Sequence, residues 1–191
     1  MKSTLECFMN EVPVMVKNGN IDNEFGLQFE LGYYLRGKGY KVYFEKNINN
    51  KGTSKHEIDL VVQKDTKRYA IELKFQKGEN VGRTVAIYNF IKDIQFAEEL
   101  KDLNFDITYC ITMVNCDSYY KLTDKEKNKD WEFFRGKVAN GAVTVKATKE
   151  LEGNIERKVK KETVSTYKLK NKYQIEWKKL TDKLWYYVVK I

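Results

Sequence analysis

Two carboxylates and a lysine within residues 55–75 occupy positions where paired β-strands normally carry packing residues. Folding this stretch, KHEIDLVVQKDTKRYAIELKF, symmetrically about Thr66 sets Asp59 roughly opposite Glu72, and opposed residues on antiparallel strands have Cβ atoms about 5 Å apart. Like charges at that separation destabilise a hairpin unless a cation offsets them. Mg²⁺ prefers carboxylate oxygens, and Lys74 projects from the same face as Glu72. This spacing predicts a magnesium site, at which Mn²⁺ can substitute.

Two strands joined by a turn are needed to bring these side chains together. Large apolar residues alternate with polar or small ones in 58–63 and again in 69–75, which is the pattern of strands with one face in a core. The intervening KDTKR has the length of a hairpin loop. We therefore expect an antiparallel hairpin that carries Asp59, Glu72 and Lys74 on the face away from its large apolar side chains.

This arrangement resembles the PD-(D/E)xK nuclease superfamily, in which an aspartate opens one strand and an acid-x-Lys triplet lies on the next. The matching residues are Asp59 and the triplet Glu72-Leu73-Lys74, and Ile58 stands where the family pattern has a proline. The resemblance implies an α/β fold with a restriction-endonuclease-like core, in which helices flank a mixed central β-sheet.

The resemblance also implies a reaction, the hydrolysis of phosphodiester bonds in DNA by a water molecule that a bound metal activates. Asp59 and Glu72 would hold one or two Mg²⁺ ions, together with the backbone carbonyl of Ile71 or Leu73. Lys74 would orient the attacking water or stabilise the charge that develops on the phosphate.

A helix ahead of the hairpin supplies a third acidic candidate. Apolar residues in 24–40 recur at helical spacing and are followed by two glycines: Leu27, Leu31, Tyr34 and Leu35, then Gly37 and Gly39. At about 100° per residue, Glu24 and Gln28 fall within about 60° of this stripe, whereas Glu30 lies roughly 90° to its side.

A glutamate of this helix often joins the metal site in the resembled superfamily. We assign a catalytic and metal-binding role to Glu24 and a supporting role to Gln28, with Glu30 as the fallback. The alternative for Glu24 is a first-turn acid that only complements the helix dipole.

Three further elements complete the expected core. Residues 41–48 alternate like a strand, 84–101 carry apolar residues at helical spacing, and 106–115 form a nearly continuous apolar run. Such a run is typical of a strand buried on both faces, here parallel to its neighbour at the end of a right-handed crossover. Residues 5–12 favour a short helix. Three polar residues of the helix at 84–101 are expected on a solvated face: Lys92, Asp93 and Gln95.

Residues 131–191 change character and favour a basic, β-rich C-terminal extension. They contain three runs that alternate like strands, among them 173–177. Residues 157–172 carry seven basic side chains against one acidic, a net charge of +6. Three of these lysines are expected to contact the nucleic-acid backbone: Lys158, Lys160 and Lys161. The alternative is a solvated strand edge that lysines protect from aggregation.

Length and composition fit a single domain, residues 1–191, whose nuclease-like core spans 24–115. The formal charge of +8 favours a polyanionic partner, and with the resemblance it predicts double-stranded DNA. The three cysteines lack C-x-x-C spacing, which fits buried thiols in a reducing compartment: Cys7, Cys110 and Cys116. No apolar run approaches 18 residues, so we expect a cytoplasmic protein without a membrane partner.

These features favour a metal-dependent deoxyribonuclease and leave two other classes open. One is a nucleic-acid-binding module that keeps the fold without catalysis, and the other is a protein-interaction domain whose basic surface only keeps it soluble. The intact Asp59, Glu72 and Lys74 count against both. The sole histidine, His56, is expected to be a bystander, because the resembled chemistry does not use one. A homodimer would suit symmetric cleavage of two strands, although no heptad pattern marks an interface.

Overall fold

The computed structural model describes residues 1–48, 57–78, 83–122, 129–160 and 162–191, and it shows a mixed α/β protein. The described residues form three α-helices, α1 (Lys2–Lys17), α2 (Glu24–Gly37) and α3 (Arg83–Lys101). The strands are β1 (Lys41–Asn47), β2 (Glu57–Lys64), β3 (Lys67–Gln76), β4 (Ile107–Val114), β5 (Thr144–Lys146), β6 (Leu151–Val159), β7 (Glu162–Tyr173), β8 (Glu176–Lys179) and β9 (Trp185–Lys190). Two 3₁₀ turns lie between β4 and β5, at Asp117–Tyr119 and Lys129–Phe133.

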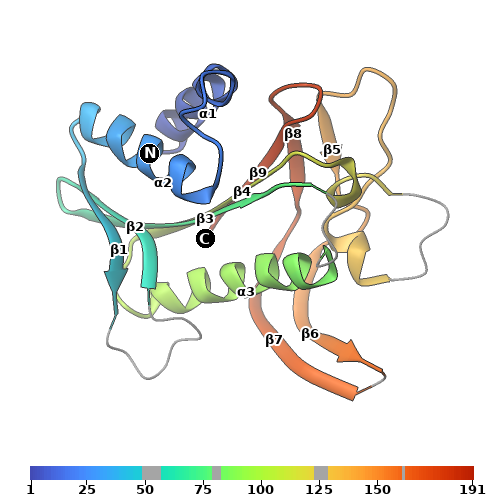
Figure 1. Ribbon diagram of the computed structural model, residues 1–191. Helices are drawn as coiled ribbons and strands as arrows, with labels where there is room; N and C mark the ends of the chain where they lie inside the picture. The colour runs from blue at the N-terminus through green and yellow to red at the C-terminus, as the bar shows by residue number, and fades with distance from the viewer. Residues whose placement is uncertain (49–56, 79–82, 123–128, 161) are drawn as a thin grey trace.

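Seven strands form the central sheet in the order β1-β2-β3-β4-β9-β8-β5. β3 and β4 are parallel, and the other neighbouring strands are antiparallel. Helices α1 and α2 cover one face of this sheet, and α3, which connects β3 to β4, lies on the other (Figure 1). β4 is buried along nearly its whole length because helices cover both of its faces. The mixed sheet flanked by helices and the parallel β4 are as the sequence predicted.

The turn of the β2–β3 hairpin is tighter than its sequence predicted. Lys64 pairs with Lys67, so that only Asp65 and Thr66 form the loop. Asp65 has a φ of 54°, a left-handed conformation that two-residue hairpin turns require and that Asp tolerates. The predicted five-residue loop is wrong because both strands continue through the charged residues next to the turn.

Apolar side chains at helical spacing hold α1 and α2 on the sheet: Leu5, Phe8, Met9 and Val12 from α1, and Leu27, Leu31 and Leu35 from α2. α1 has 16 residues, so the predicted short helix at 5–12 is wrong at both ends. Pro13 lies inside it and removes one backbone donor, and Val12 on the buried face keeps the helix packed at this point. α2 begins where Asn23 Oδ1 accepts a hydrogen bond of 2.8 Å from Gly26 N.

Some strands of the C-terminal region complete the central sheet, and the others form a sheet of their own. β9 pairs with β4, and β8 and β5 continue the sheet beyond β9. β6 and β7 form a separate two-stranded sheet, residues 151–173, which projects past α3 and is called the β6–β7 arm below (Figure 1). The predicted continuous strand over 173–177 is wrong, because β7 ends at Tyr173 and β8 begins at Glu176.

The three cysteines form no disulfide. Cys110 and Cys116 are buried, as the sequence predicted, but Cys7 is exposed because it lies on the face of α1 opposite the buried apolar side chains. Within the part of the chain that the structure describes, no helix combines the length and the hydrophobicity needed to cross a membrane.

Candidate active site

Asp59 and Glu72 meet just beyond the last paired residues of the β2–β3 hairpin. Leu60 pairs with Ile71, and extending this register by one residue on each strand sets Asp59 against Glu72, as predicted. The backbone amide of Asp59 donates to Glu72 Oε1 over 3.4 Å, and the amide of Leu73 donates to Asp59 Oδ2 over 2.7 Å. Each carboxylate therefore accepts a hydrogen bond from the backbone of the opposite strand, which fixes both acids at one position.

Glu72 is only 1% exposed, although it alternates with the large apolar residues of β3. The face that it occupies is not open to solvent, because α3 packs across it. The sequence predicted which face carries the acids but not that a helix covers this face. A buried carboxylate beside a second carboxylate is a costly arrangement that nearby cations stabilise.

Lys74 connects the hairpin to the helices on both faces of the sheet. Its Nζ is 2.8 Å from Glu24 Oε1 on α2 and 4.0 Å from Asp93 Oδ2 on α3. The other oxygen of Glu24 accepts a hydrogen bond from the backbone amide of Phe75 over 3.2 Å. The side chain of Glu24 is 40% exposed, whereas that of Asp93 is 7% exposed. Lys74 thus lies between an accessible acid and a buried one.

Gln28 and Glu30, further along α2, contact different parts of the structure. Gln28 is buried and its Nε2 donates to the backbone carbonyl of Asp59 over 2.7 Å. Glu30 instead accepts a hydrogen bond of 3.0 Å from Asn20. The helical-angle argument therefore selected two polar residues of α2 that hydrogen-bond to the hairpin, Glu24 and Gln28. The catalytic role of Glu24 stays a prediction.

Asp93 is the residue of this neighbourhood that the sequence reasoning missed. We expected it on a solvated face of the helix, and that expectation is wrong because Asp93 faces the sheet beside Lys74. A signal was available. At about 100° per residue, Asp93 lies within about 60° of Phe90 and of Ala97, which are both buried.

The donor chemistry of this site fits a hard divalent cation. Asp59, Glu72 and Glu24 carry carboxylate oxygens and Leu73 offers a backbone carbonyl, and Mg²⁺ prefers such oxygen ligands. Asp59 and Glu72 meet on the hairpin, and Glu24 and Asp93 lie within 4.0 Å of Lys74, in a chain whose net charge is +8. Within the described ranges, however, no three His, Cys, Asp or Glu side chains are arranged as a metal site. Glu24 can complete such a set only by leaving Lys74.

The structure describes two of the three lysines that we expected on nucleic acid. Lys158 and Lys160 are exposed near the tip of the β6–β7 arm, and Lys158 Nζ is 3.1 Å from Glu156. Lys161 and the histidine at position 56 lie outside the described residues. Further along the arm, Lys170 pairs with Asp102, and Lys172 with Glu150 and Glu152. The net charge of residues 157–172 therefore overstates the charge of the arm, because acids from outside this segment offset it.

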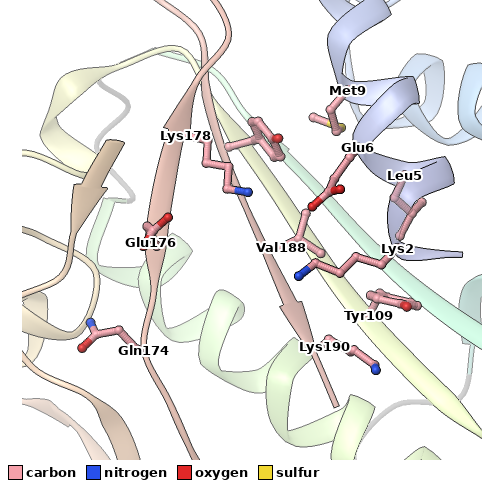
Figure 2. Close-up of a pocket in the computed structure, with 11 residues that line it drawn as sticks. Lys2, Leu5, Glu6, Met9, Tyr109, Gln174, Glu176, Lys178, Val188 and Lys190 are labelled. Carbon is pink, nitrogen blue, oxygen red and sulfur yellow. The ribbon is translucent and has the colours of Figure 1, made fainter. Parts of the chain in front are cut away.

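A cavity of about 280 Å³ lies elsewhere, between α1 and strands β4, β8 and β9. Figure 2 shows Lys2 and Glu6 of α1 facing Lys178 and Val188 of the strands across it. Burial raises the pKa of Tyr109, which also lines the cavity, to about 12. None of the lining residues belongs to the hairpin, so this cavity is separate from the candidate active site.

Comparison with known proteins adds no relative to this description. No protein-family model matches the sequence, and no curated protein or solved structure is significantly similar to the chain.

Proposed function

We propose that this protein is a metal-dependent nuclease of the PD-(D/E)xK type, with a restriction-endonuclease-like core. The observation that carries the proposal is the convergence of Asp59, the Glu72-Leu73-Lys74 triplet and Glu24 at one end of the β2–β3 hairpin. The order of elements around them supports it, since α2 leads directly into three antiparallel strands and the crossover helix α3 leads to a parallel fourth strand. The net charge of +8 favours a polyanionic substrate, and the resemblance to the PD-(D/E)xK superfamily favours DNA as that polyanion.

In this proposal Asp59 and Glu72 are the principal ligands of Mg²⁺, and the Leu73 carbonyl and Glu24 complete the set. When bound, the metal lowers the pKa of a coordinated water and offsets charge on the phosphate. Gln28 fixes the backbone of Asp59 by its hydrogen bond to the carbonyl, and so orients this ligand.

Lys74 has two acidic partners, Glu24 and Asp93, and this bears on its proposed role in catalysis. Its ammonium is bound to Glu24, and Asp93 lies 4.0 Å away on the other side. If Glu24 served as a metal ligand, Asp93 would still hold the ammonium in the site. Lys74 is then available to orient the attacking water or to stabilise the charge that develops on the phosphate.

Incubation of the purified chain with supercoiled plasmid tests the proposal. We expect open-circular or linear product with Mg²⁺ and none with excess chelator. The Asp59→Asn variant, purified in the same way, controls for contaminating nucleases and is expected to be inactive.

Absence of cleavage on DNA and RNA, with both Mg²⁺ and Mn²⁺, would contradict the proposal. A mobility shift then separates the remaining classes. Salt-dependent binding of DNA would identify a nucleic-acid-binding module, and no binding would favour a protein-interaction domain.

A further inference from the structure

The outer face of α2 carries aromatic side chains that neither the core nor the candidate active site uses. Phe25, Phe29 and Tyr33 are 65%, 53% and 70% exposed. Residues four apart share one face of a helix, and their Cα atoms are about 6 Å apart along its axis. These three residues are called the α2 aromatic stripe.

Contacts with β1 fix the stripe and place a positive charge at its end. The ring of Phe29 stacks near that of Phe44, with centroids 6.4 Å apart. Gly32 permits this approach, since a Cβ at that position would lie 2.3 Å from the Phe44 ring. The guanidinium of Arg36 lies 5.2 Å from the centre of the same ring and donates to the carbonyl of Val42. Arg36 is therefore held at the C-terminal end of the stripe.

The stripe borders the candidate active site. Its first residue, Phe25, directly follows Glu24, which binds Lys74. Gln28, which contacts Asp59, is rotated about 60° from Phe25 around the helix. A ligand that lies along the stripe thus begins beside the residues that we propose to hold the metal.

Exposed area and charge indicate the kind of partner. Aromatic side chains bury roughly 200 Å² each, so the three rings offer only about 400 Å², half of the roughly 800 Å² that each partner contributes to a stable dimer. Three exposed basic residues follow at the end of the helix: Arg36, Lys38 and Lys41. A small aromatic surface that ends in positive charge fits bases and phosphates better than a second copy of the chain.

The spacing of the rings distinguishes single strands from duplex. Stacked bases of a duplex are 3.4 Å apart and cover each other's faces, whereas the residues that carry the rings of the stripe follow one another at a rise of about 6 Å along the helix axis. Bases can therefore reach successive rings only when they are unstacked and unpaired. The stripe is about 12 Å long from Phe25 to Tyr33, enough for about three such bases.

We propose that the α2 aromatic stripe binds an unpaired segment of nucleic acid next to the candidate active site. The inference rests on the proposed function, in that it names the form of the substrate, a strand with an unpaired stretch beside the scissile phosphate. Bases stack on the rings, and Arg36 binds the backbone.

Fluorescence anisotropy with labelled oligothymidylate tests the inference, with a duplex of equal length for comparison and excess chelator to prevent cleavage. We expect Phe25→Ala, Phe29→Ala and Tyr33→Ala each to weaken oligothymidylate binding at least about fivefold, because base stacking on one ring contributes about this factor or more. Duplex binding should change less than twofold. The matched control is Tyr43→Ala, an exposed aromatic on the opposite face of β1, which should change neither. Circular dichroism verifies that each variant is folded.

Three outcomes would overturn the inference: wild-type protein that does not bind oligothymidylate, variants that bind it normally, or variants that lose duplex binding equally. Sedimentation velocity tests the competing occupant, since a dimer that these substitutions dissociate would assign the stripe to self-association. The binding assay is independent of catalysis. Stripe-dependent binding without cleavage of plasmid, oligothymidylate or RNA in Mg²⁺ or Mn²⁺ would refute the proposed function and keep the stripe as a binding site. Cleavage together with oligothymidylate binding that the three substitutions leave unaffected would keep the proposed function and refute the inference.

Discussion

Asp59 and Glu72 are two acids held close together by hydrogen bonds from each other's strand, and one of them is nearly inaccessible to water. Repulsion between such groups disfavours the metal-free fold. We therefore expect Asp59→Asn and Glu72→Gln to abolish cleavage while the melting temperature without metal stays equal or rises. Mg²⁺ should stabilise the wild type and hardly affect the variants, because a ligand that binds only the folded state raises its stability.

Differential scanning fluorimetry with and without Mg²⁺ measures this effect. Asp65→Asn is the matched control, because it removes the same charge from the turn at the other end of the hairpin, and asparagine also accepts the positive φ found there. Its response to Mg²⁺ should equal that of the wild type. If the variants at Asp59 and Glu72 respond equally too, the cation binds elsewhere.

Glu24 and Glu30 on the same helix provide a second test at the residue scale. Glu24→Gln keeps only one of the two oxygens that accept from Lys74 and Phe75 and removes the charge, so we expect cleavage to slow about 10- to 100-fold, the usual effect of losing a supporting group at a metal site. Glu30→Gln should remain within about twofold of wild type, since Glu30 contacts Asn20 instead. Initial rates over a range of Mg²⁺ concentrations measure both. If Glu24→Gln lowers stability slightly and leaves the rate unchanged, Glu24 only complements the helix dipole.

Most residues that meet at this site could be predicted from sequence because their signals are local. Alternation within two short runs identified Asp59, Glu72 and Lys74, and the helical angle identified Glu24. Asp93 was missed because a charged side chain is usually solvated, although its helical angle places it beside the buried Phe90 and Ala97. Its pairing with Lys74 depends on how α3 packs against β3, which the sequence does not show.

One buried carboxylate of helix α3 accepts several of the hydrogen bonds that join this helix to the β6–β7 arm. Glu98 on α3 accepts hydrogen bonds of 2.8 Å from the amides of Lys170 and Asn171 and from the hydroxyl of Tyr173. Glu98→Ala would leave the buried hydroxyl of Tyr173 without its acceptor, and an unsatisfied buried donor costs about 1 to 3 kcal/mol. We expect a loss of about 1 to 3 kcal/mol in the free energy of unfolding, since the two amides are only partly buried and water can replace their acceptor.

Urea unfolding followed by circular dichroism measures this loss. Glu99→Ala is the control, because the neighbouring carboxylate accepts from Gln95 on the same helix rather than from the arm. It should change stability by less than about 0.5 kcal/mol, as expected for a partly exposed helical pair. Equal effects of the two substitutions would show that Glu98 does not anchor the arm.

A separate prediction concerns DNA binding by the basic tip of the arm. Replacing Lys158, Lys160 and Lys161 with alanine should reduce the slope of log affinity against log salt by up to about three units and weaken all sequences alike, because phosphate contacts release counterions. Lys172→Ala should leave the slope unchanged, since this lysine already lies between Glu150 and Glu152. Mobility shifts at several salt concentrations measure the slopes. An unchanged slope and affinity in the triple variant would mean that these lysines do not contact DNA and only protect a strand edge from aggregation.

At the scale of the whole molecule, prediction from the sequence was most successful where neighbours in space are neighbours in the chain. The elements from α2 to β4 follow one another, so periodicity and turn signals predicted their order. The C-terminal strands instead pair with distant partners, as where Val189 of β9 pairs with Cys110 of β4. Alternation in a strand does not identify its partner, so the sequence predicted a β-rich extension but left open whether its strands extend the central sheet, as β9, β8 and β5 do, or form a separate hairpin layer, as β6 and β7 do.

The hydrophobic core contains buried tyrosines, and their ionisation should lower the stability of the whole fold at alkaline pH. Burial raises the pKa of Tyr109 and of Tyr120 from 10.0 to about 12. Between these values the unfolded chain has released the phenolic protons and the folded chain still holds them. The unfolded state then binds fewer protons, so stability is lost as pH rises through this range, by up to about 1.4 kcal/mol per pH unit for each tyrosine.

Urea unfolding at a series of pH values from neutral to strongly alkaline measures this dependence. We expect Tyr109→Phe and Tyr120→Phe each to reduce the decline above pH 10, because phenylalanine has no proton to lose. Tyr33→Phe is the control, since an exposed phenol has the same surroundings in both states, and it should leave the pH dependence unchanged. If neither substitution alters the decline in stability, the proton release that destabilises the folded protein at high pH comes from groups other than Tyr109 and Tyr120.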